Sequence, residues 1–189
     1  MKTWLRTLLL FPLLLATADA APKTRDETVF IFQNRRVTIA VPEGLGFASS
    51  KDDRGIISVR IGHPKEKISL ELAFLPDPEG RFAAERGRKE FLNETFHAHV
   101  ASSVEKAMQF EELEPRTGAG TYCVFTDASL VGKAKLPPGE FLHATTGLKT
   151  WAGVGAVFTI LSHDTQSKEY QSLMAMLRES VAEKPGPLR

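Results

Sequence analysis

Apolar and polar residues alternate with period two in three stretches of the first half of the chain. These stretches are Val37–Val41, Ile57–Ile61 and Ile68–Phe74. Such an alternation places the apolar side chains of a strand on one face, as in half-buried strands. The stretches are joined by short segments with Pro, Gly, Asn and Asp, which favour antiparallel neighbours. The region Val29–Leu75 is therefore predicted to form a meander whose single sheet has one apolar face.

The pattern changes to a helical period after Asp77 and Pro78. Asp can cap the first free amides of a helix, and Pro at the next position loses nothing by lacking an N–H. Apolar residues then recur every four positions and form a continuous stripe: Leu92, Phe96, Val100, Val104 and Met108. We therefore expect one long helix that lies across the apolar face of the sheet.

Strand patterns return after Phe110 and predict three further strands: Gly120–Thr126, Phe141–Lys149 and Val154–Ser162. The last of these is apolar on both faces, which is typical of a central, covered strand. Asp164 or Thr165 is expected to cap a final helix. Its apolar positions follow helical spacing: Tyr170, Leu173, Met174, Leu177 and Val181.

This order of elements indicates the α+β class, with a mostly antiparallel sheet and a helix on each face where both faces need cover. The first strands lead through Val41-Pro42-Glu43-Gly44 to Leu45 and Phe47, and then come further strands, a long helix, three strands and a C-terminal helix. In this order the chain resembles the PsbP-like fold group, an α/β/α sandwich, over most of Val29–Val181. The resemblance implies a docking or assembly module at most, and it carries over no functional residue.

The first 20 residues have the features of an export signal. Lys2 and Arg6 precede the apolar run Leu8–Ala16, and small residues lead to a cleavage site near Ala20. We therefore expect an exported protein, periplasmic or secreted, with no transmembrane segment in its mature part, because spanning requires roughly 20 apolar residues. The predicted organisation is a signal peptide over 1–20, a linker over 21–28, a single domain over 29–182 and a disordered tail over 183–189.

The charge balance argues against nucleic acid as a partner. The chain has 24 Lys and Arg against 23 Asp and Glu, and removing Lys2, Arg6 and Asp19 with the signal leaves equal numbers. Binding to nucleic acid favours a basic excess. The closest histidine pair, His97 and His99, would point to different sides of a helix, so no metal site is expected. No pattern indicates a cofactor.

Cys123 is the only cysteine, so no intramolecular disulfide is expected. It lies in mid-strand, where a small buried hydrophobic residue is expected. A reactive thiol would need a nearby base, and His143 and His163 are the candidates. One alternative function is therefore a small thiol-dependent hydrolase that uses Cys123 with one of these histidines. Another is a carrier with a pocket for an apolar ligand between the long helix and the sheet.

The segment Asp127–Gly139 is the longest stretch without a clear period, and loops of about 12 residues or more are often functional. Lys133 and Lys135 can present two ammonium groups to an anionic partner, and Leu136 can face that partner. The sequence thus favours an exported, non-catalytic binding or assembly module. Its expected partner is an envelope protein or a small ligand that contacts this loop.

Overall fold

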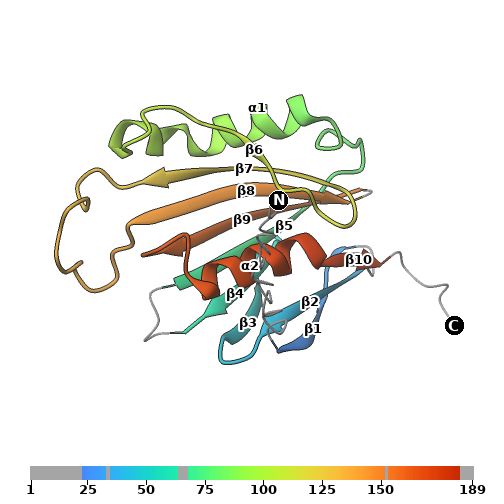
Figure 1. The fold of residues 1–189 in the computed structure, drawn as a ribbon. Helices are drawn as coiled ribbons and strands as arrows, with labels where there is room; N and C mark the ends of the chain where they lie inside the picture. Colours follow the sequence, from blue (N-terminus) through green and yellow to red (C-terminus); the bar gives the residue numbers. More distant parts are fainter. Residues whose placement is uncertain (1–22, 33–34, 64–67, 152, 184–189) are drawn as a thin grey trace, which may run out of the picture.

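The computed structural model of the protein describes residues 23–32, 35–63, 68–151 and 153–183. Two antiparallel sheets and two helices form an α+β fold (Figure 1), which confirms the expected class. The predicted signal peptide over 1–20 and residues 184–189 of the predicted tail lie outside the described residues. Within the described ranges, no helix combines the length and the apolar character needed to cross a membrane.

The larger sheet has seven strands in the order β3-β4-β5-β9-β8-β7-β6, and all neighbours are antiparallel. The strands are β3 (Gly46–Lys51), β4 (Ile57–Gly62), β5 (Ile68–Pro76), β6 (Glu111–Glu112), β7 (Ala119–Thr126), β8 (His143–Trp151) and β9 (Val154–Ser162). Strand β9 lies at the centre between β5 and β8, which confirms its predicted central position. The expected cover is found on only one of its faces, because Val157, Thr159 and Leu161 on the other face are half-buried.

A separate smaller sheet has the order β1-β2-β10. Its strands are β1 (Thr24–Phe30), β2 (Arg36–Pro42) and β10 (Val181–Glu183). The prediction of one meander over Val29–Leu75 is therefore wrong, because the chain passes from the small sheet to the large one between Pro42 and Gly46. Gly44 makes this change of direction at φ 91°, a conformation that favours glycine. Strand β1 also begins earlier than the domain start expected at Val29.

Helices cover opposite faces of the large sheet. Helix α1 (Glu85–Phe96) packs on β7 and β8, whereas α2 (Lys168–Glu179) packs against β2, β5 and β9. The small sheet lies on the same side as α2 (Figure 1). The main core fills the space between α2 and the two sheets, and its largest fully buried apolar side chains include Phe74, Phe158, Ile39, Leu70, Leu173 and Leu177.

The first helix is shorter than predicted at both ends. Asp77 does bind free amides, with Oδ1 accepting from the N–H of Arg81 (2.8 Å) and Oδ2 from that of Phe82 (3.1 Å). These amides belong to a turn, however, because Gly80 has φ 68° and interrupts a helical path. Helix α1 therefore begins only at Glu85.

At its other end α1 gives way to the 3₁₀ helix η2 (His97–Ser102). The predicted apolar stripe is buried at Leu92, but it does not continue as a helix beyond Ser102. There the N–H of Val104 donates to the carbonyl oxygen of Thr126 on β7 at 2.8 Å. This bond holds the chain beside the sheet and leaves the Val104 side chain 52% exposed.

The final helix also differs in its ends. Its N-cap is Ser167, whose Oγ accepts from the N–H of Tyr170 at 3.2 Å, rather than Asp164 or Thr165. Val181, expected in this helix, begins β10 instead and pairs with Thr38 of β2. The apolar positions from Tyr170 to Leu177 are buried as predicted.

A buried lysine closes the C-terminal end of α2. Lys149, on β8, is completely buried, and its Nζ donates to the carbonyl oxygens of Leu177 (2.6 Å), Arg178 (3.2 Å) and Ser180 (2.5 Å). The ammonium group also lies 4.8 Å from the centre of the Trp151 ring. The last carbonyls of a helix have no partner within it, and Lys149 donates to them together with Ser180 Oγ, which bonds the carbonyl oxygen of Leu177, and the N–H of Arg116, which bonds that of Arg178. Burial lowers the pKa of Lys149 to about 7.

Candidate functional site

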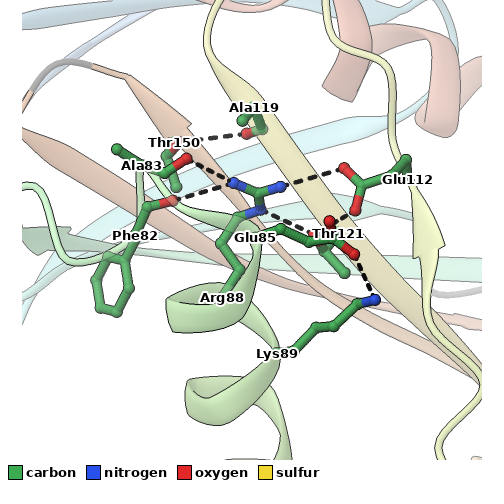
Figure 2. Close-up of polar contacts among 9 residues, drawn as sticks. All are labelled: Phe82, Ala83, Glu85, Arg88, Lys89, Glu112, Ala119, Thr121 and Thr150. Carbon is green, nitrogen blue, oxygen red and sulfur yellow. Dashed lines mark hydrogen bonds and ion pairs between the residues drawn. The ribbon is translucent and has the colours of Figure 1, made fainter.

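A second buried cation fixes the position of α1 on the large sheet. The guanidinium group of Arg88 donates to Thr121 Oγ1 of β7 (2.8 Å) and pairs with Glu112 of β6 (3.2 Å). It also donates to the carbonyl oxygens of Phe82 and Ala83 at 3.3 and 2.9 Å. Figure 2 shows this side chain reaching from the first turn of α1 toward β7 and the strand β6 beside it. Arg88 thus holds α1 at the β6–β7 edge of the sheet.

Because α1 lies at that edge, no helix among the described residues covers the other half of the same sheet face. The strands in this half are β3, β4, β5 and β9. Val157 of β9 packs against the apolar residues beneath α1 and marks the boundary. We call the uncovered area the open-face groove, and it is lined by Ala48, Ser50, Ser58, Arg60, Glu71, Ala73, Val157 and Thr159.

The burial of alternate residues confirms that only one face of these strands is covered. On β5, for example, Leu70 and Leu72 are buried toward α2, whereas Glu71 is exposed and Ala73 is half-buried. Strand β8 differs, because residues on both of its faces are buried from Thr145 to Trp151. The change from β8 to β5 therefore marks the edge of the area that α1 covers.

The open-face groove consists of two adjoining hollows, of about 430 and 440 Å³, that share Ala48, Arg60 and Glu71. Arg60 and Glu71 form a cross-strand ion pair at 2.6 Å in the middle of the groove, and both side chains are exposed. Their charges offset each other. In the first hollow most of the other lining side chains are small, so its floor is close to the main chain. The second hollow is also lined by the larger apolar side chains of Phe47, Phe141 and Leu161.

A third, smaller hollow continues the groove toward η2. It has a volume of about 240 Å³ and shares Phe141 and Leu161 with the second hollow. His99 lines it from η2, where its ring stacks on Phe96 and also contacts Phe125. The groove therefore runs from the exposed strand β3 to the end of α1.

The residues predicted to contact a partner lie outside the lining of these hollows. Lys133 and Lys135 are exposed and Leu136 is half-buried, all in the loop between β7 and β8. The two ends of this loop, at Asp127 and at residues 139–142, border the groove, whereas its middle does not. The predicted loop therefore adjoins the groove and does not form it.

The structure does not bring Cys123 and His143 together. Cys123 pairs with Thr146 across β7 and β8, and its Sγ lies 3.4 Å from Thr146 Oγ1. His143 pairs with Thr126, three residues further along β7, so its side chain is on the opposite face of the sheet. Burial lowers the pKa of His143.

The second candidate base is engaged elsewhere. His163 follows the end of β9, and its Nε2 bonds the carbonyl oxygen of Glu140 at 2.9 Å. Its ring stands edge-on to that of Phe141. Within the part of the chain that the structure describes, no three His, Cys, Asp or Glu side chains gather as ligands for a metal ion.

Cys123 should resist alkylation in the folded protein. The residue is fully buried, and burial raises the pKa of its thiol, so little thiolate forms at neutral pH. We expect iodoacetamide at pH 7.5 to label it only after denaturant is added, as followed by intact mass. A rapid reaction without denaturant would contradict this and would support the thiol-enzyme alternative.

The sequence analysis did not predict the open-face groove, although the sequence contains an indication of it. Strands with one solvated face usually carry large polar side chains on that face, whereas this face has Ala48, Ser50, Ser58 and Ala73. The pattern shows which positions point away from the core. It does not show which strands the helix leaves uncovered, because that depends on the long-range contacts of Arg88.

Neither the family models nor the curated proteins nor the solved structures include a match to this chain. The resemblance to the PsbP-like fold group therefore stays a prediction.

Proposed function

We propose that this protein is an exported, non-catalytic binding or assembly module that holds part of a partner protein in the open-face groove. The observation that carries the proposal is the half of a sheet face that α1 leaves uncovered. An antiparallel sheet can leave one face to solvent, and such a face usually carries polar side chains. Here, apart from the exposed Glu71, the side chains of β5 and β9 on this face are mostly small or apolar and half-buried.

The shape of the groove favours a polypeptide over a small molecule. Its hollows adjoin one another along the sheet and open to solvent, whereas sites for small molecules bury most of the ligand's surface. The small side chains of Ser58, Ala73 and Thr159 leave room for the side chains of a partner. Because Arg60 and Glu71 pair with each other, the groove offers shape and hydrogen bonds rather than net charge.

The positions of the reactive groups also favour binding over catalysis. Cys123 and His143 face opposite sides of the sheet, and His163 bonds a carbonyl group. A nucleophile and its base need to lie within hydrogen-bond reach. The β7–β8 loop with Lys133, Lys135 and Leu136 is a second proposed contact, since it leads directly into the end of the groove at Phe141.

Photo-crosslinking in the cells of origin tests this proposal. A benzoylphenylalanine residue at Ser58 or Thr159 should form one discrete adduct with a partner protein, and the same residue at the exposed Asn93 of α1 should not. The variant Ala73→Arg, which fills the groove, should remove the adduct without changing the melting temperature. The partner is then identified by mass spectrometry, and binding is repeated with the two purified proteins.

Two results would contradict the proposal. One is the same set of adducts from Asn93 as from the groove positions. The other is an adduct that persists in Ala73→Arg. If the purified protein instead retains a small apolar molecule in native mass spectrometry, the carrier alternative replaces the binding module.

A further inference from the structure

The edges of the two sheets differ in how they are protected from pairing with another strand. Exposed edges are commonly made short or charged, since an open edge pairs readily with another strand. Strand β6 has two residues and β10 has three, so both are short. Strand β1 has seven residues, but it carries Arg25, Asp26 and Glu27 in succession.

Strand β3, at the remaining edge, has neither protection. It is six residues long, and its only charged residue is Lys51 at the end. All of its side chains are exposed except Phe47, which is half-buried. Within the described residues, backbone hydrogen bonds of Gly46–Lys51 run only to β4. The outer N–H and C=O groups of an ordered strand are thus available along its whole length.

We propose that two copies of the protein pair through β3, antiparallel about a two-fold axis, so that their large sheets join into one. An antiparallel pair with a two-fold axis presents the same row of donors and acceptors from each copy, so one edge strand is complementary to itself. Three features of β3 and its surroundings favour a second copy of the protein as the strand that pairs with this edge.

First, no like charges face each other. The residues from Gly46 to Ser50 are uncharged. Antiparallel pairing about a two-fold axis places the two Lys51 side chains at opposite ends of the pair, well away from each other.

Second, the side chains allow close approach. Gly46, Ala48, Ser49 and Ser50 are small, and none of them extends past the main chain to block a neighbouring strand. Third, no helix obstructs the edge. Helix α1 lies on β7 and β8, and β8 is four strand spacings, roughly 19 Å, from β3.

The pairing would also extend the open-face groove. Ala48 and Ser50 line the groove from β3, so the grooves of two paired copies adjoin and form one two-fold symmetric surface. The pairing itself does not depend on the proposed function and needs no other partner. Because one short strand contributes less than the roughly 1,200 Å² of a standard interface, we expect a weak, reversible dimer.

Sedimentation equilibrium of the purified protein measures this directly. Between about 10 μM and about 1 mM, a range typical of weak association, the average mass should rise from that of one copy toward that of two. Amide hydrogen exchange at both concentrations locates the contact. The amides of Gly46–Lys51 should exchange more slowly at high concentration, whereas those of β1, the other long edge, should not change.

The double variant Ala48→Lys/Ser49→Lys places four lysines beside the two-fold axis and should keep the protein monomeric throughout this range. Asn93→Lys/Ala98→Lys adds the same charge at exposed positions of α1 and η2 and should dimerise like the original protein. Equal melting temperatures show that both variants fold. If the β3 variant unfolds, the pairing is tested by the concentration dependence of amide exchange in the original protein.

A monomer at every concentration overturns the pairing, and so does a dimer that leaves β3 exchange unchanged. If the protein is a monomer but the Ser58 position still crosslinks to a partner protein, the pairing is wrong and the proposed function stands. If the protein dimerises but no such crosslink forms, the proposed function is wrong and the pairing stands.

Discussion

Replacing Lys149 with methionine should lower the free energy of unfolding by about 2–4 kcal/mol. The methionine fills a similar volume but cannot donate hydrogen bonds. The carbonyl groups of Leu177 and Ser180, which Lys149 Nζ satisfies at 2.6 and 2.5 Å, would stay buried without that donor. Urea denaturation followed by tryptophan fluorescence measures the change. Lys133→Met, the same substitution in the exposed β7–β8 loop, should change stability by less than about 0.5 kcal/mol.

The same variant should alter how stability depends on pH. Burial holds the pKa of Lys149 at about 7 in the folded protein, below its ordinary value of 10.5. Between these values the unfolded chain binds the extra proton, so Lys149 makes stability rise with pH, by at most about 1.4 kcal/mol per unit. Below pH 7 the amine is protonated in both states and its contribution is constant. Lys149→Met should lack this rise, and equal pH profiles would contradict the assignment.

Replacing Arg88 with methionine should cost about 2–4 kcal/mol of stability, because it removes a buried charged partner from several groups at once. Glu112 and the carbonyl groups of Phe82 and Ala83 would lose a donor (Figure 2). Since Arg88 holds α1 on the sheet, amide exchange should accelerate in α1 more than in α2. Chemical denaturation and hydrogen exchange together measure both effects.

Arg86→Met is the matched control, because Arg86 lies one half-turn away on the same helix. Its pair with Glu90 is exposed to solvent, and exposed pairs of this kind contribute about 0.3–0.5 kcal/mol. A loss from Arg88→Met as small as that from Arg86→Met would show that Arg88 does not anchor α1.

The sequence predicted the parts of the fold that depend on local pattern. The two apolar faces of Val154–Ser162 located the central strand, and the spacing from Tyr170 to Leu177 located the buried side of α2. Period-two alternation, however, is the same in any half-buried strand. It therefore did not show that Val37–Val41 and Ile57–Ile61 belong to different sheets. In the structure Val37–Val41 pairs with β1 and β10 instead of β4, and the contact with β10 is long-range.

The site was harder to predict because two charged residues act against their usual preference. Lys and Arg are mostly exposed in proteins, and the sequence pattern places Lys149 at the end of a predicted strand. In the fold, Lys149 and Arg88 are among the most buried polar residues. Each binds groups distant in sequence, such as Ser180 and Thr121. The extent of the open-face groove follows from where Arg88 places α1, so it depends on contacts that no local pattern records.

The small sheet joins the two ends of the described chain. Strand β10 pairs with β2, and Arg36 and Glu183, 147 positions apart, form an ion pair across them at 2.5 Å. During synthesis this sheet therefore cannot close until Val181–Glu183 has left the ribosome, although the strands of the large sheet, which end at Ser162, are made earlier. Contacts of such long range also slow folding. The small sheet is thus the part of the described fold that can be completed last.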